Sequence, residues 1–143
     1  MLARQLGDRN NEMHRGFWNK KSSDCVEIRG KVLGIVGYGH IGSQLSVMAE
    51  SMGMKVVFYD VAQIMSLGNA RSFSSLSDVL KISDFVTLHV PELSSTRNMI
   101  GVNEIAQMKP GSFLLNASRG SVVDLEALKG ALESGHIKGA ALI

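Results

Sequence analysis

The sequence predicts an α/β fold built around a doubly wound parallel sheet, and three observations support this class. Short apolar runs alternate with segments of helical periodicity from residue 31 onward. The first run leads into a glycine-rich turn, and the second ends on an aspartate. The length of 143 residues, with 45% hydrophobic and 20% charged side chains, suits one globular domain. Such alternation gives a parallel sheet with helices on both faces.

Residues 1–30 form a polar segment ahead of the alternating part. A few apolar side chains are scattered through it, namely Leu2, Leu6, Phe17 and Trp18. We expect a short helix followed by an irregular arm. The segment holds six Lys/Arg and four Asp/Glu, whereas residues 31–143 hold nine of each, so the net charge of +2 resides in the segment. A charge this small does not indicate a nucleic-acid partner.

The first strand–helix–strand unit lies within residues 32–60. Residues 32–36 are a short apolar run, typical of a buried parallel strand. A helix follows, closed by Gly53, because five apolar residues recur at helical spacing. These residues are Ile41, Leu45, Met48, Ala49 and Met52. Residues 55–60 are the second strand, and we interpret the methionines at 48, 52 and 54 as packing residues.

The alternation then continues with a helix and a strand. Ser75 and Asp78 have the spacing of a capping box, which starts a helix. Leu76, Val79 and Leu80 mark its apolar face. Residues 85–90 are the next strand, which Pro91 ends.

Two more helices and strands complete the pattern. Asn103 is expected to cap a short helix that carries Ile105 and Met108, and residues 113–116 form a strand. Asp124 is expected to cap the last helix, which Gly135 ends. One face of this helix carries Leu125, Leu128 and Leu132. Residues 140–143 begin another apolar strand.

The run GYGHIG over residues 37–42 has the G-x-G-x-x-G spacing of a dinucleotide-binding turn, between a predicted strand and a predicted helix. Gly37 permits the tight turn, Gly39 lets the backbone approach a pyrophosphate, and Gly42 lets the helix pack closely on the strand. Backbone N–H groups of His40 and Ile41 would then face the phosphates. This context disfavours a glycine turn that binds nothing.

Asp60 ends the second strand 18 residues after Gly42. A carboxylate at this place accepts a hydrogen bond from a ribose hydroxyl and repels the 2′-phosphate of NADP. The sequence therefore predicts a Rossmann-type sheet with NAD as its cofactor.

His89 lies at a strand end, where open α/β sheets bind their ligands. It is either a cofactor-side residue or a strand-end histidine whose hydrogen bonds are satisfied, and both interpretations remain open. His14 and His136 have no metal-ligand spacing, so we expect surface residues and no metal site. A single cysteine, Cys25, excludes an internal disulfide.

Arg119 follows the apolar strand 113–116 at the ligand edge of the predicted sheet. Its planar donor fork suits a carboxylate or a carbonyl that gains negative charge. A surface arginine in a loop is the alternative.

Four motifs occur in order along the chain: GYGHIG at 37–42, LHVPE at 88–92, MKPG at 108–111 and NASRGSVVD at 116–124. Together they resemble the NAD-binding domain of the D-isomer-specific 2-hydroxyacid dehydrogenases over essentially the whole chain. The resemblance implies hydride transfer between NAD and the CH–OH group of a 2-hydroxy acid. The expected reaction is oxidation of 3-phosphoglycerate to 3-phosphohydroxypyruvate, in serine biosynthesis.

The same resemblance implies site residues. Those on the cofactor are Gly37, Gly39, His40, Ile41, Gly42, Asp60, His89, Pro91, Ala117 and Ser118. Arg119 would lie beside the nicotinamide and would be the catalytic arginine, which orients the carboxylate and carbonyl of the substrate. Residues 1–30, which comprise the N-terminal helix and the arm with Gly16 to Trp18, would form the dimer contact, since the intact family forms homodimers or tetramers.

Part of the family's catalytic machinery does not occur in these residues. The family's histidine–glutamate pair lies beyond the strand at 140–143, and its substrate domain lies outside residues 31–143. Ile143 stands where the family usually has an aspartate that binds the nicotinamide amide. We therefore expect a truncated domain, incomplete at the C-terminal side of its sheet and inactive alone.

Two other functions stay open. The chain could be a catalytically dead NAD(H)-binding regulatory module, or a dehydrogenase of another 2-hydroxy acid. Residues 1–5 lack the apolar core of a secretory signal, and no apolar run is long enough to span a membrane. We expect a cytoplasmic protein.

Overall fold

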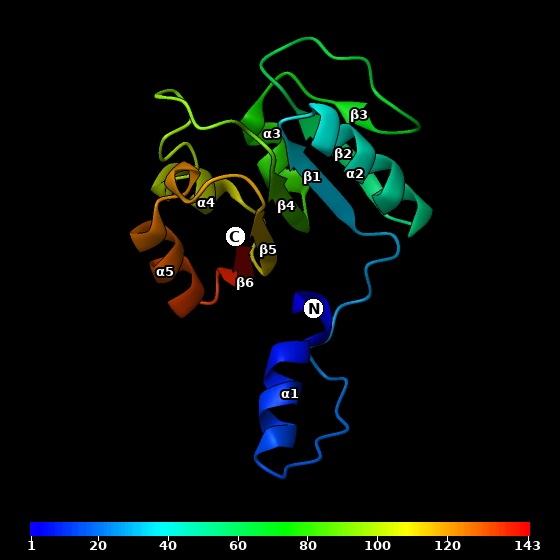
Figure 1. Ribbon diagram of the computed structural model, residues 1–143, viewed down its shortest axis with the longest axis vertical. Helices are drawn as coiled ribbons and strands as arrows, with labels where there is room; N and C mark the ends of the chain where they lie inside the picture. The colour runs from blue at the N-terminus through cyan, green and yellow to red at the C-terminus, as the bar shows by residue number, and fades with distance from the viewer.

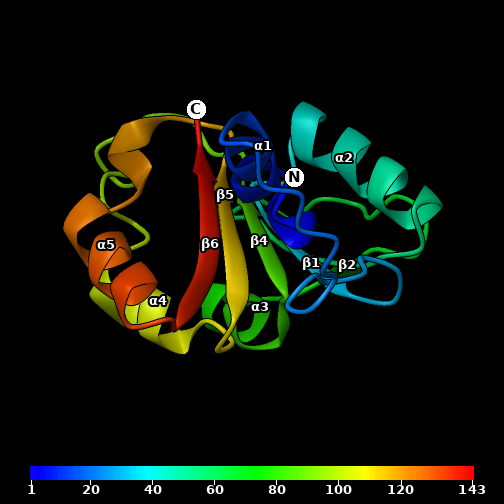
Figure 2. The same cartoon turned by 90° about the horizontal axis from the view of Figure 1, so that it is seen from below.

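The computed structural model describes residues 1–143 and contains one sheet of six parallel strands. The strands run in the order β3-β2-β1-β4-β5-β6. They are β1 (Val32–Val36), β2 (Lys55–Tyr59), β3 (Arg71–Ser72), β4 (Phe85–Leu88), β5 (Ser112–Asn116) and β6 (Ile137–Leu142). Figure 2 shows β6 at one edge with β5 and β4 beside it. The predicted α/β class with a Rossmann-type parallel sheet is confirmed.

Five α-helices and two short 3-10 helices accompany the sheet. The α-helices are α1 (Leu6–His14), α2 (His40–Ser51), α3 (Leu76–Ile82), α4 (Val102–Gln107) and α5 (Leu125–Glu133). The 3-10 helices are η1 (Leu2–Arg4) and η2 (Gly120–Val122). None of the helices is long and apolar enough to cross a membrane.

Each face of the sheet packs against its own hydrophobic cluster, because neighbouring residues of a strand point to opposite faces. Ile35 and Phe85 belong to the cluster under α2, whereas Val36 and Val86 belong to the cluster under α3, α4 and α5. Burial on both faces explains why the strands read as continuous apolar runs.

The buried face of α2 differs from the prediction. Ile41, Met48 and Met52 are 67%, 61% and 48% exposed, so they are not packing residues in this structure. Leu45 and Ala49 of the predicted face do pack in or against the cluster under α2, and the helix also buries Gly42 and Ser46. Small side chains bring the helix axis closer to the strands than leucine or methionine would allow, and the larger side chains are left on the outer surface.

The face of α5 also differs, because Leu125 and Leu132 are 56% and 38% exposed, while Leu128 and Ala131 are buried. The predicted cap of this helix is confirmed. Asp124 Oδ1 accepts hydrogen bonds from the N–H groups of Glu126 and Ala127 at 3.0 and 3.1 Å.

One predicted helix start is wrong, and another is right in position but lacks the predicted side-chain cap. Helix α4 begins after Gly101 and not after Asn103, because the Gly101 N–H donates to Glu104 Oε2 at 3.1 Å and closes the first turn earlier. Ser75 does precede α3, but its side chain makes no capping hydrogen bond. Strand β3 has only two residues, too few for a periodic pattern to indicate it.

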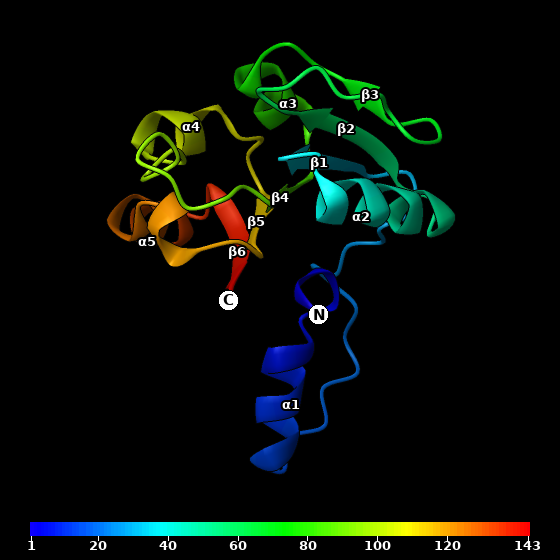
Figure 3. The same ribbon diagram turned by 45° about the horizontal axis from the view of Figure 1, so that its top comes forward.

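The N-terminal arm consists of η1, α1 and an irregular stretch up to Lys31, as expected. Figures 1 and 3 show α1 projecting away from the sheet. The two ends of the arm remain attached: the Val26 N–H donates to the Ala3 carbonyl at 2.7 Å, and Ala3 is buried in the cluster under α2. Phe17 and Trp18, at the far end, are 64% and 75% exposed.

The sheet order reverses next to β1, because β2 pairs with one side of it and β4 with the other. Chains that leave the carboxyl ends of β1 and β4 therefore diverge. A crevice opens at such a switch point, and ligands of doubly wound sheets bind there.

Candidate functional site

The three glycines of the turn after β1 differ in how much space surrounds the position that a Cβ would take. Gly37 has φ +90°, and a Cβ on it would lie 2.6 Å from the carbonyl oxygen of His89. A Cβ on Gly42 would lie 2.2 Å from the carbonyl oxygen of Gly37. Both positions exclude any side chain. Gly39 differs, since a Cβ there would meet no atom within 4 Å.

The space beside Gly39 lies at the start of α2. Gly39 is the N-cap residue, and no side chain caps the helix. The first N–H groups of a helix have no partner within the helix, and the helix dipole places partial positive charge at this end. The site is therefore suited to a phosphate group.

Asp60 directly follows β2, and two backbone N–H groups orient its carboxylate. Oδ2 accepts from Tyr38 at 2.7 Å, and Oδ1 accepts from Ala62 at 2.9 Å. Each carboxylate oxygen can accept a further hydrogen bond. The carboxylate is thus held in place with capacity left for a hydroxyl donor.

One part of the crevice lies between the carboxyl ends of β1, β2 and β4. Its cavity has a volume of about 210 Å³ and a mostly apolar wall around one carboxylate, that of Asp60. The residues that line it are Val36, Gly37, Gly39, Tyr59, Asp60, Val61, His89, Val90, Pro91, Leu93, Ser95, Thr96 and Met99. We call it the Asp60 pocket.

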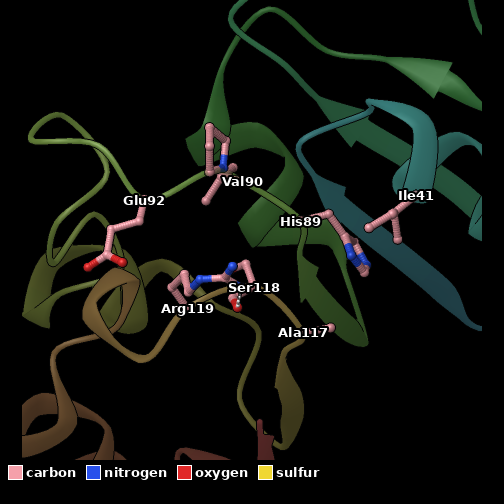
Figure 4. A pocket seen from close by; sticks show the side chains of 8 residues that line it. Ile41, His89, Val90, Glu92, Ala117, Ser118 and Arg119 are labelled. Carbon is pink, nitrogen blue, oxygen red and sulfur yellow. Dashed lines mark hydrogen bonds between the residues drawn. The ribbon is translucent and has the colours of Figure 1, made fainter.

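A second cavity of about 440 Å³ adjoins it, and the two share His89, Val90 and Pro91. We call it the Arg119 pocket. It is lined by Ile41, His89, Val90, Pro91, Glu92, Ala117, Ser118 and Arg119. Figure 4 shows Ile41 and His89 at one end of this pocket and Glu92 and Arg119 at the other.

Asn116, at the end of β5, holds the loop that carries Arg119. Its side chain is buried, Nδ2 donates to the Arg119 carbonyl at 2.8 Å, and Oδ1 accepts from Ser118 N–H and Oγ at 3.0 and 2.7 Å. The Arg119 side chain is exposed, and its Nη1 donates to the Ser118 carbonyl at 3.0 Å. The backbone of the loop is fixed, while the guanidinium is accessible.

His89 forms the boundary between the two pockets. Its Nε2 is 3.0 Å from Thr87 Oγ1, and its buried Nδ1 has no partner. Burial lowers the pKa of His89 below its usual 6.5, so the ring is neutral at pH 7. Since only one ring nitrogen is satisfied, the strand-end interpretation does not account for this residue.

The structure gathers most of the predicted site residues and leaves some apart. Gly42 is buried inside the helix packing, and the His40 side chain lines neither pocket. His136 is also remote from the crevice, with Nε2 2.9 Å from the carbonyl oxygen of Ile105 in α4. No group of three or more His, Cys, Asp or Glu side chains is arranged to hold a metal ion.

Sequence reasoning missed two residues of the site. Glu92 lines the Arg119 pocket and accepts a hydrogen bond from Ser121 Oγ at 2.8 Å, joining the loops after β4 and β5. Tyr38 has a buried side chain and orients Asp60 through its backbone. Both residues lie within the quoted motifs, which was the available signal.

The crevice fits an extended dinucleotide. The carboxylate of Asp60, the uncapped start of α2 and the loop that carries Arg119 follow one another along it. The apolar walls of the Asp60 pocket suit a planar base.

Comparison with known families and proteins leads to the same ligand. A family model described as D-isomer specific 2-hydroxyacid dehydrogenase, NAD binding domain, matches residues 1–142. The chain is 57% identical over 141 residues to D-3-phosphoglycerate dehydrogenase of Dictyostelium discoideum and 56% identical over 142 residues to that of Escherichia coli. Each alignment covers 99% of this chain and 35% of the relative, so the chain spans about a third of these proteins.

Solved structures of dehydrogenases with bound NAD have the same fold as this chain. The NAD complex of a D-isomer specific 2-hydroxyacid dehydrogenase from Lactobacillus delbrueckii ssp. bulgaricus superposes with a TM-score of 0.89 at 38% identity, over 99% of this chain and 44% of that one. D-lactate dehydrogenase with NAD⁺ from Lactobacillus jensenii gives 0.88 at 38% identity, over 99% and 43%.

Proposed function

This chain belongs to the D-isomer specific 2-hydroxyacid dehydrogenase family, with NAD as its cofactor, and we propose that it is the NAD-binding part of a dehydrogenase of 3-phosphoglycerate. The reaction would oxidise the 2-hydroxyl of that acid to the ketone of 3-phosphohydroxypyruvate. The observation that carries the proposal is the continuous crevice with Asp60 at one end and Arg119 at the other.

We assign a role to each part of the crevice. Asp60 would accept hydrogen bonds from the adenosine ribose, and the N–H groups of His40 and Ile41 would hold the pyrophosphate. Pro91 and His89 would line the middle of the crevice, and Ala117 and Ser118 would flank the nicotinamide. When bound, NAD⁺ accepts the hydride that leaves the substrate carbon.

Arg119 is the proposed catalytic residue of this chain. Its guanidinium would bind the substrate carboxylate and polarise the oxygen that becomes a carbonyl. Charged hydrogen bonds of this kind are short and directional. The hydroxyl proton needs a separate base, and general acid–base catalysis contributes about 10²–10⁴-fold. We propose that the 143 residues by themselves bind NAD but turn over little or no substrate.

The first test is cofactor binding by the unchanged chain and by Asp60→Ala, followed through the fluorescence of NADH. We expect the unchanged chain to bind NADH more tightly than NADPH. Asp60→Ala should weaken the affinity for NADH at least tenfold and reduce the difference between the affinities for NADH and NADPH. Asp78→Ala, on an exposed turn of α3, is the matched control and should bind like the unchanged chain. Equal affinity of Asp60→Ala and the unchanged chain for NADH would contradict the assignment.

Turnover distinguishes the proposal from its alternatives. A full-length relative that contains this segment should reduce NAD⁺ with 3-phosphoglycerate and lose activity in Arg119→Ala. Preference for glycerate or lactate would indicate another 2-hydroxy acid as substrate. NADH binding with no turnover in the full-length protein would indicate a regulatory module.

A second copy of this chain is the partner that we propose. The arm projects from the sheet and exposes two aromatic side chains, Phe17 and Trp18, at its far end. Exposed aromatic residues on an extension are typical of an interface.

A further inference from the structure

The second half of the connection between β2 and β3 is held against helix α2. We call residues 61–70 the adenosine-side segment, because it starts next to Asp60 and contributes Val61 to the Asp60 pocket. Val61 and Met65 are 91% and 87% exposed, whereas Ile64 packs against the cluster under α2 and Ala70 is buried in it, so hydrogen bonds act together with this packing to hold the segment. Figure 3 shows it leaving β2 and returning to the sheet at β3.

The first attachment is a chain of hydrogen bonds through Tyr38. Leu67 N–H donates to the phenolic oxygen at 3.3 Å, and Tyr38 Oη lies 2.6 Å from Ser46 Oγ in α2. Ser46 Oγ donates its one proton to the carbonyl of Ser43 at 2.7 Å. The phenol must therefore donate to Ser46, which leaves its oxygen free to accept from Leu67.

Glu50 makes the second attachment, one helical turn further along α2. Its Oε1 accepts from Asn69 N–H at 2.9 Å. Gly68 packs against the same carboxylate so closely that a Cβ there would lie 2.3 Å from Oε2. Ser46 and Glu50 are four residues apart, so they lie on one face of the helix.

Tyr38 contacts both ends of this arrangement. Its backbone N–H orients Asp60, and its hydroxyl holds Leu67, at the far end of the adenosine-side segment. The ring between them is 1% exposed and stacks on Phe58 with centroids 3.7 Å apart. Such a ring has one available position, so the carboxylate and the segment are set relative to each other.

We propose that Tyr38 is a positioning residue that, together with Glu50, sets the preference of the crevice for a ribose 2′-hydroxyl over a 2′-phosphate. The inference rests on the proposed role of Asp60. The fixed carboxylate of Asp60 would repel the phosphate, and the segment held beside it, which contributes Val61 to the pocket, would limit the room for the larger group, whereas the hydroxyl needs only an acceptor. Selectivity is the difference between the binding free energies of NADH and NADPH. Release of the segment would reduce this difference, because the 2′-phosphate of NADPH would then fit better.

The test uses Tyr38→Phe, which keeps the stacked ring and removes the hydroxyl. Hydrogen exchange without cofactor should show the Leu67 amide exchanging at least tenfold faster, with the amides of β1 unchanged. The ratio of the NADPH and NADH dissociation constants should fall at least fivefold, mostly through tighter NADPH binding. Ser51→Ala removes a hydroxyl from the exposed side of α2 and should change neither quantity.

Glu50 gives an independent pair of variants, should Tyr38→Phe fail to fold. Glu50→Ala should reduce the ratio of the NADPH and NADH dissociation constants. Glu50→Gln keeps an acceptor for the Asn69 N–H and should retain most of this ratio. Unchanged Leu67 exchange in Tyr38→Phe, or faster exchange with an unchanged ratio, would overturn the inference and leave the role of Asp60 intact. Equal affinities of the unchanged protein for NADH and NADPH would overturn both.

Discussion

His89 illustrates how burial decides the charge of a side chain within the crevice. Because burial lowers its pKa, the folded protein resists protonation of His89 where the unfolded chain, with a pKa near 6.5, accepts it. The unfolded state then binds more protons, so the free energy of unfolding decreases as the pH falls. The contribution of His89 is complete above pH 6.5 and is lost between that pH and its lower folded pKa.

We therefore expect His89→Asn to flatten the pH dependence of stability. Urea unfolding measured from pH 7.5 down to pH 5 should show a smaller decrease in the free energy of unfolding for the variant than for the unchanged protein. His14, His40 and His136 are present in both proteins, so the difference isolates His89. Parallel curves would show that His89 titrates alike in the folded and unfolded states.

Asn116 shows what one buried amide does for a functional loop. Asn116→Asp keeps the size and the acceptor oxygen but loses the donor to the Arg119 carbonyl. The Arg119 carbonyl keeps its hydrogen bond from the Val122 N–H at 3.1 Å, but it would face a carboxylate oxygen in place of the amide donor, so we expect urea unfolding to show destabilisation of about 1–3 kcal/mol, together with weaker NADH binding. Ser121→Ala removes a bond at the edge of the same loop and should cost less than about 0.5 kcal/mol.

At the scale of elements, the contact between α2 and β1 depends on the absence of a side chain. A Cβ on Gly42 would lie 2.2 Å from a backbone oxygen, which can move only if the helix moves. Gly42→Ala should therefore destabilise the protein by about 1–3 kcal/mol, as overpacking does. The same substitution at Gly130, in open space within α5, should stabilise by about 0.5–1 kcal/mol.

Thermal unfolding of the two variants makes this comparison direct, because both change glycine to alanine within a helix. Helix propensity favours alanine in each case. Opposite shifts in Tm would show that the contact with β1, and not propensity, governs the start of α2. Shifts of the same sign would contradict the close approach.

The elements also show where a sequence pattern is a poor guide to burial. Helical spacing correctly indicates that α2 and α5 are helices, since both periodic segments fold as predicted. It is only partly right about the buried face of α2, where the predicted Ala49 is buried but the predicted Met48 is 61% exposed. Hydrophobicity ranks methionine above alanine, but a helix that approaches a sheet closely buries whichever residues are small enough.

At the scale of the whole molecule, the arm and the sheet are joined through core packing. Leu2, Ala3, Val26 and Ile28 pack in or against the cluster under α2, although they come from the arm. The domain boundary that we predict near residue 30 is therefore a boundary in composition. The part of the arm between Ala3 and Val26 is free of the core, since α1 buries no residue and Phe17 and Trp18 are exposed.

This division predicts the oligomeric state of variants. Sedimentation equilibrium should find the unchanged chain as a dimer, and the double substitution Phe17→Ser and Trp18→Ser should shift it to a monomer that remains folded. Val61→Ser, which removes an equally exposed apolar side chain elsewhere, is the control and should remain dimeric. A monomeric unchanged chain would contradict the proposed homodimer.

The class of fold, the parallel strands and the cofactor follow from the amino-acid sequence alone. Each of these depends on local patterns: apolar runs, glycine spacing and an acid at a strand end. The packing of the folded chain was needed to show that His89 lies between two pockets, that Asn116 holds the Arg119 loop, and that Tyr38 and Glu50 bind the adenosine-side segment. The physical reason is that these are contacts between residues from different elements, and a pattern along the chain carries no distance between them.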